Sequence, residues 1–280
     1  MLRKSLNLLR SWLEEPAPQP DPETARFAYP LLNRLVEEAA EAFGSEQRPA
    51  YTWGVAHGAY LAHNLGTERI SVLELGVAGG KGLVALEHAA EWVEQALGVA
   101  VEVHGFDTGA GLPKPEDYRD LPNLWTEGAF PMDVEALQAR LRRASLHLGL
   151  VRDTIPAFLE TRPAPIAFIS FDLDLYSSTV DALRLLEADP ALLLPRIHCY
   201  LDDILGFTFA DFNGERLAIR EFNQTHTWRK VSPIYGTRFY VPPRYANAIW
   251  TEKLYLAHIL DHPRYGDYDG LVRRARMDLA

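Results

Sequence analysis

Short runs of apolar residues alternate along the chain with longer segments in which apolar residues recur every three or four positions. Continuous apolar runs are typical of strands buried on both faces, and the longer spacing is typical of helices with one buried face. Strands are expected at residues 70–73, 101–106, 146–151, 166–171, 197–201 and 237–241. Helices are expected at residues 26–43, 83–97, 134–144, 178–186 and 214–224. This alternation predicts an α/β fold, with a largely parallel sheet covered by helices on both faces.

The first residues form a different pattern. Residues 1–13 place leucines on one helical face with basic residues between them, and residues 14–23 are rich in proline and acid. We therefore expect an N-terminal helix and Pro-rich linker at residues 1–24, followed by one domain at residues 25–280. The helix has no continuous apolar region, so it does not resemble a signal peptide. It is expected to dock on the body of the protein or on a second subunit of a homo-oligomer.

Composition and charge exclude several classes of protein. The formal net charge of −10 argues against a nucleic-acid partner, and the basic cluster at residues 273–276 is expected to be a solvated tail. The single cysteine, Cys199, excludes an internal disulfide and a zinc site built from thiolates. No run approaches the ~18 apolar residues of a membrane span, so we expect a cytoplasmic protein.

A glycine-rich segment follows the first expected strand. Residues 74–80 read Glu-Leu-Gly-Val-Ala-Gly-Gly. A dinucleotide motif would need glycine at Ala78 and at Lys81, and a P-loop would need glycine at Leu75. The remaining pattern, Glu-x-Gly-x-x-x-Gly, is typical of S-adenosylmethionine sites, where glycines let backbone amides approach the ligand at a helix N-terminus. The alternative is a tight turn that needs glycine only for its geometry.

Carboxylates end the later strands. Asp107 follows the strand at residues 101–106 and could bind both hydroxyls of a ribose, or cap a loop or helix. Asp172 and Asp174 follow the run at residues 166–171. In an open α/β sheet, ligands bind outside the carboxyl ends of the strands, so these groups are expected on one rim with the glycine loop.

A second pair, Asp202 and Asp203, ends the strand at residues 197–201. Carboxylates that lie close together repel one another, and a hard divalent cation, most naturally Mg²⁺, removes that conflict. The alternative is that Asp174 or Asp203 caps a helix. None of the nine histidines forms a metal-binding pair on a recognisable helix.

The order of these motifs resembles the macrocin O-methyltransferases, which are class I S-adenosylmethionine-dependent enzymes with a metal site similar to that of catechol O-methyltransferase. The resemblance runs from about residue 69 to residue 223 and comprises residues 73–80, 105–108, 111–113, 125–128, 153–156, 172–179 and 202–203. It implies a Rossmann-like, seven-stranded class I methyltransferase sheet. The chain departs from the family pattern at residues 109–110, at Leu173 and at Ser177, and it has Leu175 where the catechol enzymes have lysine. These departures leave the base and the acceptor undefined.

The resemblance also assigns roles to individual residues. Those expected at the cofactor are Glu74, Gly76 and Gly80 at its methionine and ribose part, Asp107 with Thr108 at the ribose, and Asp153 near the adenine. Those expected at the metal are Asp172, Asp202 and Asp203. The resemblance does not identify the base, and our own candidates for holding the acceptor or moving its proton are Asp172, Asp174, Tyr176 and His57.

The expected activity is S-adenosylmethionine-dependent and Mg²⁺-dependent O-methylation of a small molecule, such as a sugar, a phenol or a natural-product intermediate. Two alternatives remain open. Asp172-Leu173-Asp174 also resembles the DxD element of metal-dependent glycosyltransferases. The chain could also be a non-catalytic protein that binds S-adenosylmethionine. The loop at residues 109–133 has a length typical of functional lids or of disordered segments. The stretch with Phe207, Phe209 and Phe212 is expected to be a lid or an acceptor wall, with a dimer contact as the alternative.

Overall fold

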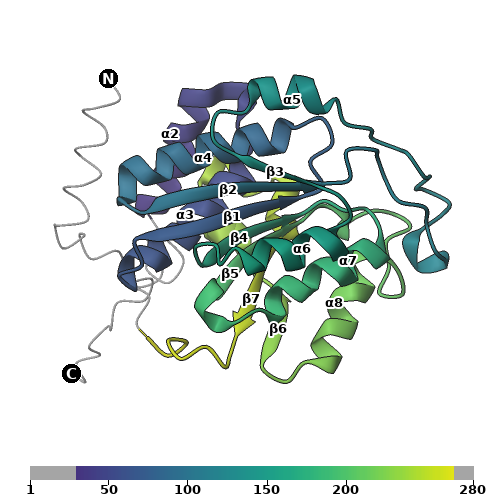
Figure 1. Ribbon diagram of the computed structural model, residues 1–280. Coiled ribbons are helices and arrows are strands. Elements are labelled where there is room, and N and C mark those ends of the chain that lie inside the picture. Colours follow the sequence, from purple (N-terminus) through teal and green to yellow (C-terminus); the bar gives the residue numbers. More distant parts are fainter. Residues whose placement is uncertain (1–29, 268–280) are drawn as a thin grey trace.

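The computed structural model describes residues 30–267. Its centre is a seven-stranded sheet with the order β3-β2-β1-β4-β5-β7-β6 (Figure 1). Strands β1 to β5 run parallel to one another, and β7 runs antiparallel between β5 and β6. The strands are β1 Arg69–Leu75, β2 Ala100–Asp107, β3 Ser145–Leu148, β4 Ile166–Phe171, β5 Leu193–Leu201, β6 Arg229–Pro233 and β7 Leu254–Ile259. The predicted α/β fold, a Rossmann-like sheet of seven strands covered by helices, is confirmed.

Helices cover both faces of the sheet (Figure 1). On one face α3 and α4 pack on the central strands and α2 packs on both of these helices. On the opposite face α7 packs between α6 and α8. The helices are α2 Pro30–Phe43, α3 Pro49–Asn64, α4 Lys81–Leu97, α5 Val134–Arg140, α6 Val151–Glu160, α7 Tyr176–Leu183 and α8 Gly214–Thr225. The central strands β1, β4 and β5 are buried along almost their whole length, which explains their continuous apolar runs.

Helix α3 was not predicted from the sequence. It is buried without interruption from Ala50 to Ala59, so it has no polar face and no apolar stripe for periodicity to detect. Two glycines let it approach the sheet closely. A Cβ on Gly54 would lie 2.3 Å from the ring of Phe168, and one on Gly58 would lie 2.9 Å from the carbonyl oxygen of Ala167. The N-terminus of α3 is thereby fixed at the carboxyl ends of the strands.

Several predicted boundaries were wrong. The expected strand at residues 146–151 stops at Leu148, and α6 begins at Val151. Residues 237–241 contain a short 3-10 helix, Thr237–Phe239, in place of the expected strand. The last two strands are β6 and β7 instead, and β6 carries few buried apolar side chains because it lies at the edge of the sheet.

The remaining predictions about the ends of the chain are not addressed by the structure. The helix and linker expected at residues 1–24, the oligomer contact assigned to that helix, and the basic cluster at residues 273–276 lie outside the described residues. Among residues 30–267, no helix combines the length and the apolarity that crossing a bilayer requires.

Two histidine rings are buried in the core beneath α3. His57 of α3 stacks on Trp53 with ring centroids 3.9 Å apart, and it lies 5.3 Å from the ring of His198 on β5. Burial lowers the pKa of His57 well below its usual range and lowers that of His198 to about 3. Both rings are therefore neutral in the folded protein at pH values where unfolded histidine is charged.

This arrangement predicts that the free energy of unfolding decreases as the pH falls below about 6.5, because the unfolded chain binds protons that the folded rings do not bind. Each such histidine should contribute a slope of about 1.4 kcal/mol per pH unit between about pH 6 and pH 4. Urea unfolding of the wild type and of His198→Leu over this range measures the difference. The free energy of unfolding of the variant should depend less steeply on pH, by about 1.4 kcal/mol per pH unit, because one fewer proton is bound on unfolding. Identical slopes would show that His198 does not stay neutral in the fold.

Candidate functional site

A cavity of about 440 Å³ opens at the carboxyl ends of the central strands. The glycine loop after β1 and the residues that end β2 line one side of it. The aspartates that follow β4 and β5 line the other side. The structure therefore brings together, around one cavity, these residues singled out from the sequence: Glu74, Gly76, Gly80, Asp107, Thr108, Asp172, Asp174, Asp202 and Asp203.

The glycine loop lies tightly against its neighbours. Gly76 has a φ of 86°, and a Cβ there would lie 1.8 Å from the carbonyl oxygen of Asp172. Gly80 has a φ of 76°, and its Cβ would lie 2.1 Å from a methyl group of Leu137. Only glycine fits position 76 without a backbone shift, and the positive φ at position 80 also favours glycine. The loop ends at the N-terminus of α4, where no side chain caps the first turn, so backbone amides of that turn are available to a ligand.

Asp107 holds this loop in place. Its Oδ2 accepts hydrogen bonds from the amides of Val77 and Ala78, at 2.8 and 2.9 Å, and its Oδ1 accepts one from the amide of Gly109 at 2.7 Å. A carboxylate has about four lone-pair positions, so capacity remains for a ligand hydroxyl. Thr108 beside it donates its hydroxyl to the carbonyl oxygen of Gly111 at 2.6 Å.

Glu74 lies at the bottom of the cavity and is 1% exposed. Its Oε1 accepts a hydrogen bond from the hydroxyl of Tyr51 at 2.9 Å, and that hydroxyl also lies 2.7 Å from the Ser170 hydroxyl. The other carboxylate oxygen, Oε2, is buried and has no hydrogen-bond partner in the protein. Burial raises the pKa of Glu74 to about 8. An unsatisfied buried acceptor on a cavity wall is costly, and a bound group with N–H donors would remove that cost.

The aspartates at the opposite side form an acidic cluster in which Asp174 and Asp203 are buried and Asp172 and Asp202 are partly exposed. The amide of Asp174, which has a φ of 63°, donates to Oδ2 of Asp203 at 3.1 Å. Burial and repulsion between the carboxylates raise the pKa of Asp172 to about 7, that of Asp174 to about 8 and that of Asp203 to about 6.

Asp202 differs from the other three because it has a cationic partner. Nζ of Lys253 lies 2.8 Å from its Oδ1, and the hydroxyl of Tyr200 donates to the same oxygen at 2.7 Å. Burial alone would raise the pKa of Asp202, but these two hydrogen bonds outweigh burial and the pKa is lowered.

Sequence reasoning missed three charged residues at this cluster. Arg48, which precedes α3, lines the cavity with Nη1 3.9 Å from Oδ2 of Asp172. Lys253 immediately precedes β7. Glu215 of α8 is fully buried and accepts the amide of Asp203 at 3.0 Å. Arg48 and Lys253 adjoin α3 and β7, which the hydrophobic pattern did not predict. Glu215 belongs to no sequence motif that would identify it.

The predicted metal ligands do not form a metal site as they stand. Within residues 30–267, no three Asp, Glu, His or Cys side chains are placed to hold one ion. The carboxylate oxygens of Asp172, Asp202 and Asp203 have the chemistry that a hard cation prefers. However, Lys253 already binds Oδ1 of Asp202. A divalent cation would require these side chains to turn toward one point, with Asp202 offering Oδ2 or Lys253 releasing Oδ1.

Three predicted site residues lie elsewhere. His57 is buried in the core against Trp53 and does not line the cavity, so we withdraw it as a proton carrier. Tyr176 is also outside the lining, and its hydroxyl donates to Glu221 at 2.5 Å. Asp153 lies in the first turn of α6 with its side chain exposed, whereas residues 149–151 just before it line the cavity.

Of the two segments expected to cover the site, one lines the cavity and the other does not. The loop at residues 109–133 forms a wall of the cavity through Leu112, Trp125 and Phe130. The phenylalanines at 207, 209 and 212 do not line the cavity, and Phe207 and Phe212 are exposed.

Comparison with known proteins gives low similarities. No family model and no curated protein matches the chain. Among solved structures, the O-methyltransferase NovP is 16% identical, with a TM-score of 0.47 over 63% of this chain and 72% of NovP. The calicheamicin methyltransferase CalS11 is 22% identical, with a TM-score of 0.45 over 79% of this chain and 84% of CalS11. An O-methyltransferase from Bacillus cereus, solved with SAH, is 14% identical, with a TM-score of 0.40 over 93% of this chain and 100% of that one. Similarities this low do not assign a function, which must come from the cavity itself.

The loop geometry gives a test with a matched control. Gly76→Ala should destabilise the protein by about 2–4 kcal/mol, because it combines a positive φ with a clash against the backbone of Asp172. Gly79→Ala changes the same loop where a Cβ meets nothing within 4 Å and φ is not positive, so it should cost less than about 1 kcal/mol. Urea unfolding measures both. Equal effects of the two substitutions would contradict the close approach of the loop to β4.

Proposed function

We propose that the chain is an S-adenosylmethionine-dependent O-methyltransferase that acts on a hydroxyl group of a small molecule. The observation that carries this proposal is the single cavity that joins a glycine loop at a helix N-terminus to an acidic cluster. The first half has the features that a nucleoside ligand needs, and the second half can hold a hydroxyl group and accept its proton.

The donor half fits S-adenosylmethionine in three respects. Asp107 can accept hydrogen bonds from ribose hydroxyls in addition to those it accepts from the loop. The unpaired Oε2 of Glu74 offers an acceptor to the ammonium group of the methionine part. Trp125 and Phe130, whose rings meet edge to face with centroids 6.2 Å apart, give an apolar wall for a flat base.

The charge of the cavity favours a cationic ligand. Its lining contains the carboxylates of Glu74, Asp107, Asp172, Asp174, Asp202 and Asp203 but only two cations, Arg48 and Lys81. A sulfonium donor carries a positive charge that such a cavity attracts. After transfer the sulfur is neutral, so the acidic wall holds the product less strongly than the substrate.

The acceptor half supplies oxygen atoms at the end of the cavity formed by β4 and β5. Asp172 and Asp174 line this end and are the candidates to orient the acceptor hydroxyl. The acceptor oxygen forms a bond to the methyl carbon as the carbon–sulfur bond breaks, and the electron pair of that bond stays on sulfur. The hydroxyl proton passes to a carboxylate. Positioning of this kind can contribute ~7–11 kcal/mol to lowering the barrier.

Metal dependence is a separate part of the proposal. If Asp172, Asp202 and Asp203 hold Mg²⁺, either Asp202 offers its other oxygen, Oδ2, or Lys253 releases Oδ1. Turnover that is lost in a chelator and restored by Mg²⁺ would support a metal enzyme. Turnover that survives chelation would leave Lys253 and Arg48 as the positive charges of the acidic cluster.

The donor assignment is tested by calorimetric titration with S-adenosylhomocysteine and, separately, with a uridine-diphosphate sugar. We expect binding of the first only. Asp107→Ala should raise the Kd for S-adenosylhomocysteine at least about tenfold, because it removes both the ribose acceptor and the bonds that hold the loop. Asp153→Ala, which changes an aspartate outside the cavity lining, is the control and should leave the Kd unchanged. Binding of the sugar nucleotide without S-adenosylhomocysteine would favour a glycosyltransferase with a DxD element.

The acceptor assignment is tested by Asp172→Asn. Over a panel of sugar and phenol acceptors, formation of S-adenosylhomocysteine should fall at least about 100-fold, whereas the Kd for S-adenosylhomocysteine should change less than about threefold. Parallel loss of both would count against a role at the acceptor. If the wild type binds S-adenosylhomocysteine but methylates no acceptor of the panel, a non-catalytic binding protein is favoured.

A further inference from the structure

The long loop at residues 109–133 is a folded wall of the cavity. Its two halves bind each other, since the amide of Leu112 donates to the carbonyl oxygen of Ala129 at 2.8 Å and the amide of Gly128 donates to that of Leu112 at 2.9 Å. Leu112, Trp125 and Phe130 line the cavity. Something must hold this wall against the body of the protein, because the loop crosses the rim far from the sheet (Figure 1).

The loop is attached at the N-terminus of α7. This helix has Leu175 at its N-cap position, and no cap side chain accepts from its first turn. The missing acceptor is Asp120, which comes from the loop. It accepts hydrogen bonds from the amide of Ser177 at 2.7 Å and from the hydroxyl of Ser177 at 3.0 Å.

Asp120 is also bound within its own loop. Its Oδ2 accepts the amide of Glu116 at 2.8 Å, and the residue is only 1% exposed. Asp120 and the helix that it caps lie 57 residues apart in the sequence. The cap therefore links the loop to α7, whereas a cap from a residue next to the helix would not.

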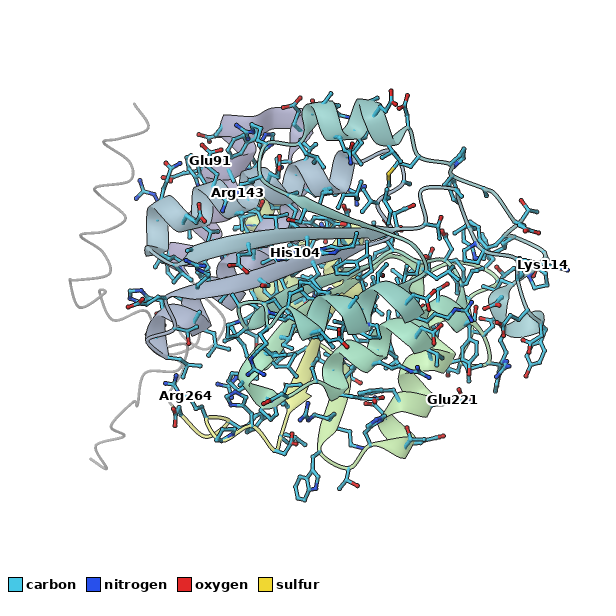
Figure 2. All side chains as sticks on the ribbon, viewed as in Figure 1. Glu91, His104, Lys114, Arg143, Glu221 and Arg264 are labelled. Carbon is cyan, nitrogen blue, oxygen red and sulfur yellow. The ribbon has the colours of Figure 1, made fainter. Side chains whose placement is uncertain are left out.

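A second contact strengthens the attachment. The guanidinium of Arg119 lies 4.5 Å from the ring centroid of Tyr176, and its Nη1 donates to the hydroxyl of Tyr176 at 3.1 Å. That hydroxyl donates in turn to Glu221 of α8. Figure 2 shows Glu221 on α8 and Lys114 at the outer edge of the loop, both on the same side of the view.

The first turn of α7 continues directly from the acidic cluster. Asp174 has a left-handed backbone that costs free energy for a residue with a side chain. The amide of Leu175 binds the carbonyl oxygen of Leu173 at 2.6 Å, and Ser178 of α7 lines the cavity. A cap that fixes the start of α7 therefore also restrains the turn that carries Asp172 and Asp174.

We propose that Asp120 is a positioning residue that fastens the loop wall of the donor half to the turn that carries the acidic cluster. This proposal rests on the proposed function, since the two sides that Asp120 joins are the donor half and the acceptor half of one reaction. Its role is not to touch the cofactor but to keep both halves at a fixed spacing.

The test compares Asp120→Ala, Asp120→Asn and a control, Asp189→Ala. Asp189 caps the short 3-10 helix Pro190–Leu192, which does not line the active-site cavity. Calorimetry gives the Kd for S-adenosylhomocysteine, hydrogen exchange with mass spectrometry reports on residues 109–133 and 172–178, and thermal unfolding gives Tm. Asp120→Ala should raise the Kd about five- to tenfold and speed exchange in both segments.

Asp120→Asn keeps an acceptor oxygen and should restore the Kd to within about threefold of the wild type. Asp189→Ala should change neither the Kd nor exchange in these segments. The proposal is overturned if Asp120→Ala leaves exchange at residues 109–133 unchanged, or if both alanine variants change Tm and Kd equally. Should Asp120→Ala fail to fold, Arg119→Ala removes the second contact and should speed exchange in the same two segments; unchanged exchange there overturns the proposal.

If the wild type does not bind S-adenosylhomocysteine, the proposed function fails while exchange still tests the attachment.

Discussion

Buried negative charge at one edge of the sheet is the constraint on which the rest of the site depends. Burial raises the pKa of Asp172, Asp174 and Asp203, and repulsion from neighbouring carboxylates, including Asp202, raises each of these pKa values further. Carboxylates held in this way are stable only if cations, hydrogen bonds or a ligand offset the repulsion. The protein supplies two cations, Arg48 beside Asp172 and Lys253 on Asp202. The lining remains acidic even so, and a positively charged ligand is the partner that such a cavity favours.

Because these carboxylates repel one another, the backbone around the acidic cluster has to be held in place by several contacts. The glycine loop approaches the backbone of Asp172 so closely that a Cβ at Gly76 has no space. Glu215 binds the amide of Asp203, and Asp120 caps the helix that follows Asp174. These contacts fix the cluster through the backbone of Asp172, Asp203 and the turn after Asp174, while the four aspartates still line the cavity. The donor side and the acidic side are thereby held as one unit.

Much of this architecture could be predicted from the sequence, because the signals are local. Continuous apolar runs identified β1, β4 and β5, and the residues directly after them identified the rim. Glycines with a positive φ and carboxylates at strand ends are visible as short motifs. The order of these motifs predicted the fold class correctly even though the identity to solved structures is 22% or less in the three compared.

What the sequence did not reveal depends on tertiary contacts. Helix α3 has no polar face, so its sequence shows no helical periodicity of apolar residues. Arg48, which precedes this helix, could therefore not be placed at the site. Asp120 and Lys253 act on groups more than 50 residues away, which no motif marks. His57 and Tyr176 have side chains suited to catalysis, but the fold directs one into the core and the other toward α8.

The most direct test of the account is a crystal structure of the protein with S-adenosylhomocysteine. We expect the ligand to lie along the glycine loop, with its ribose on Asp107 and its sulfur facing Asp172 and Asp174 across the cavity. A ligand bound elsewhere, or a sulfur that faces away from the acidic cluster, would contradict the claim that donor and acceptor share this cavity.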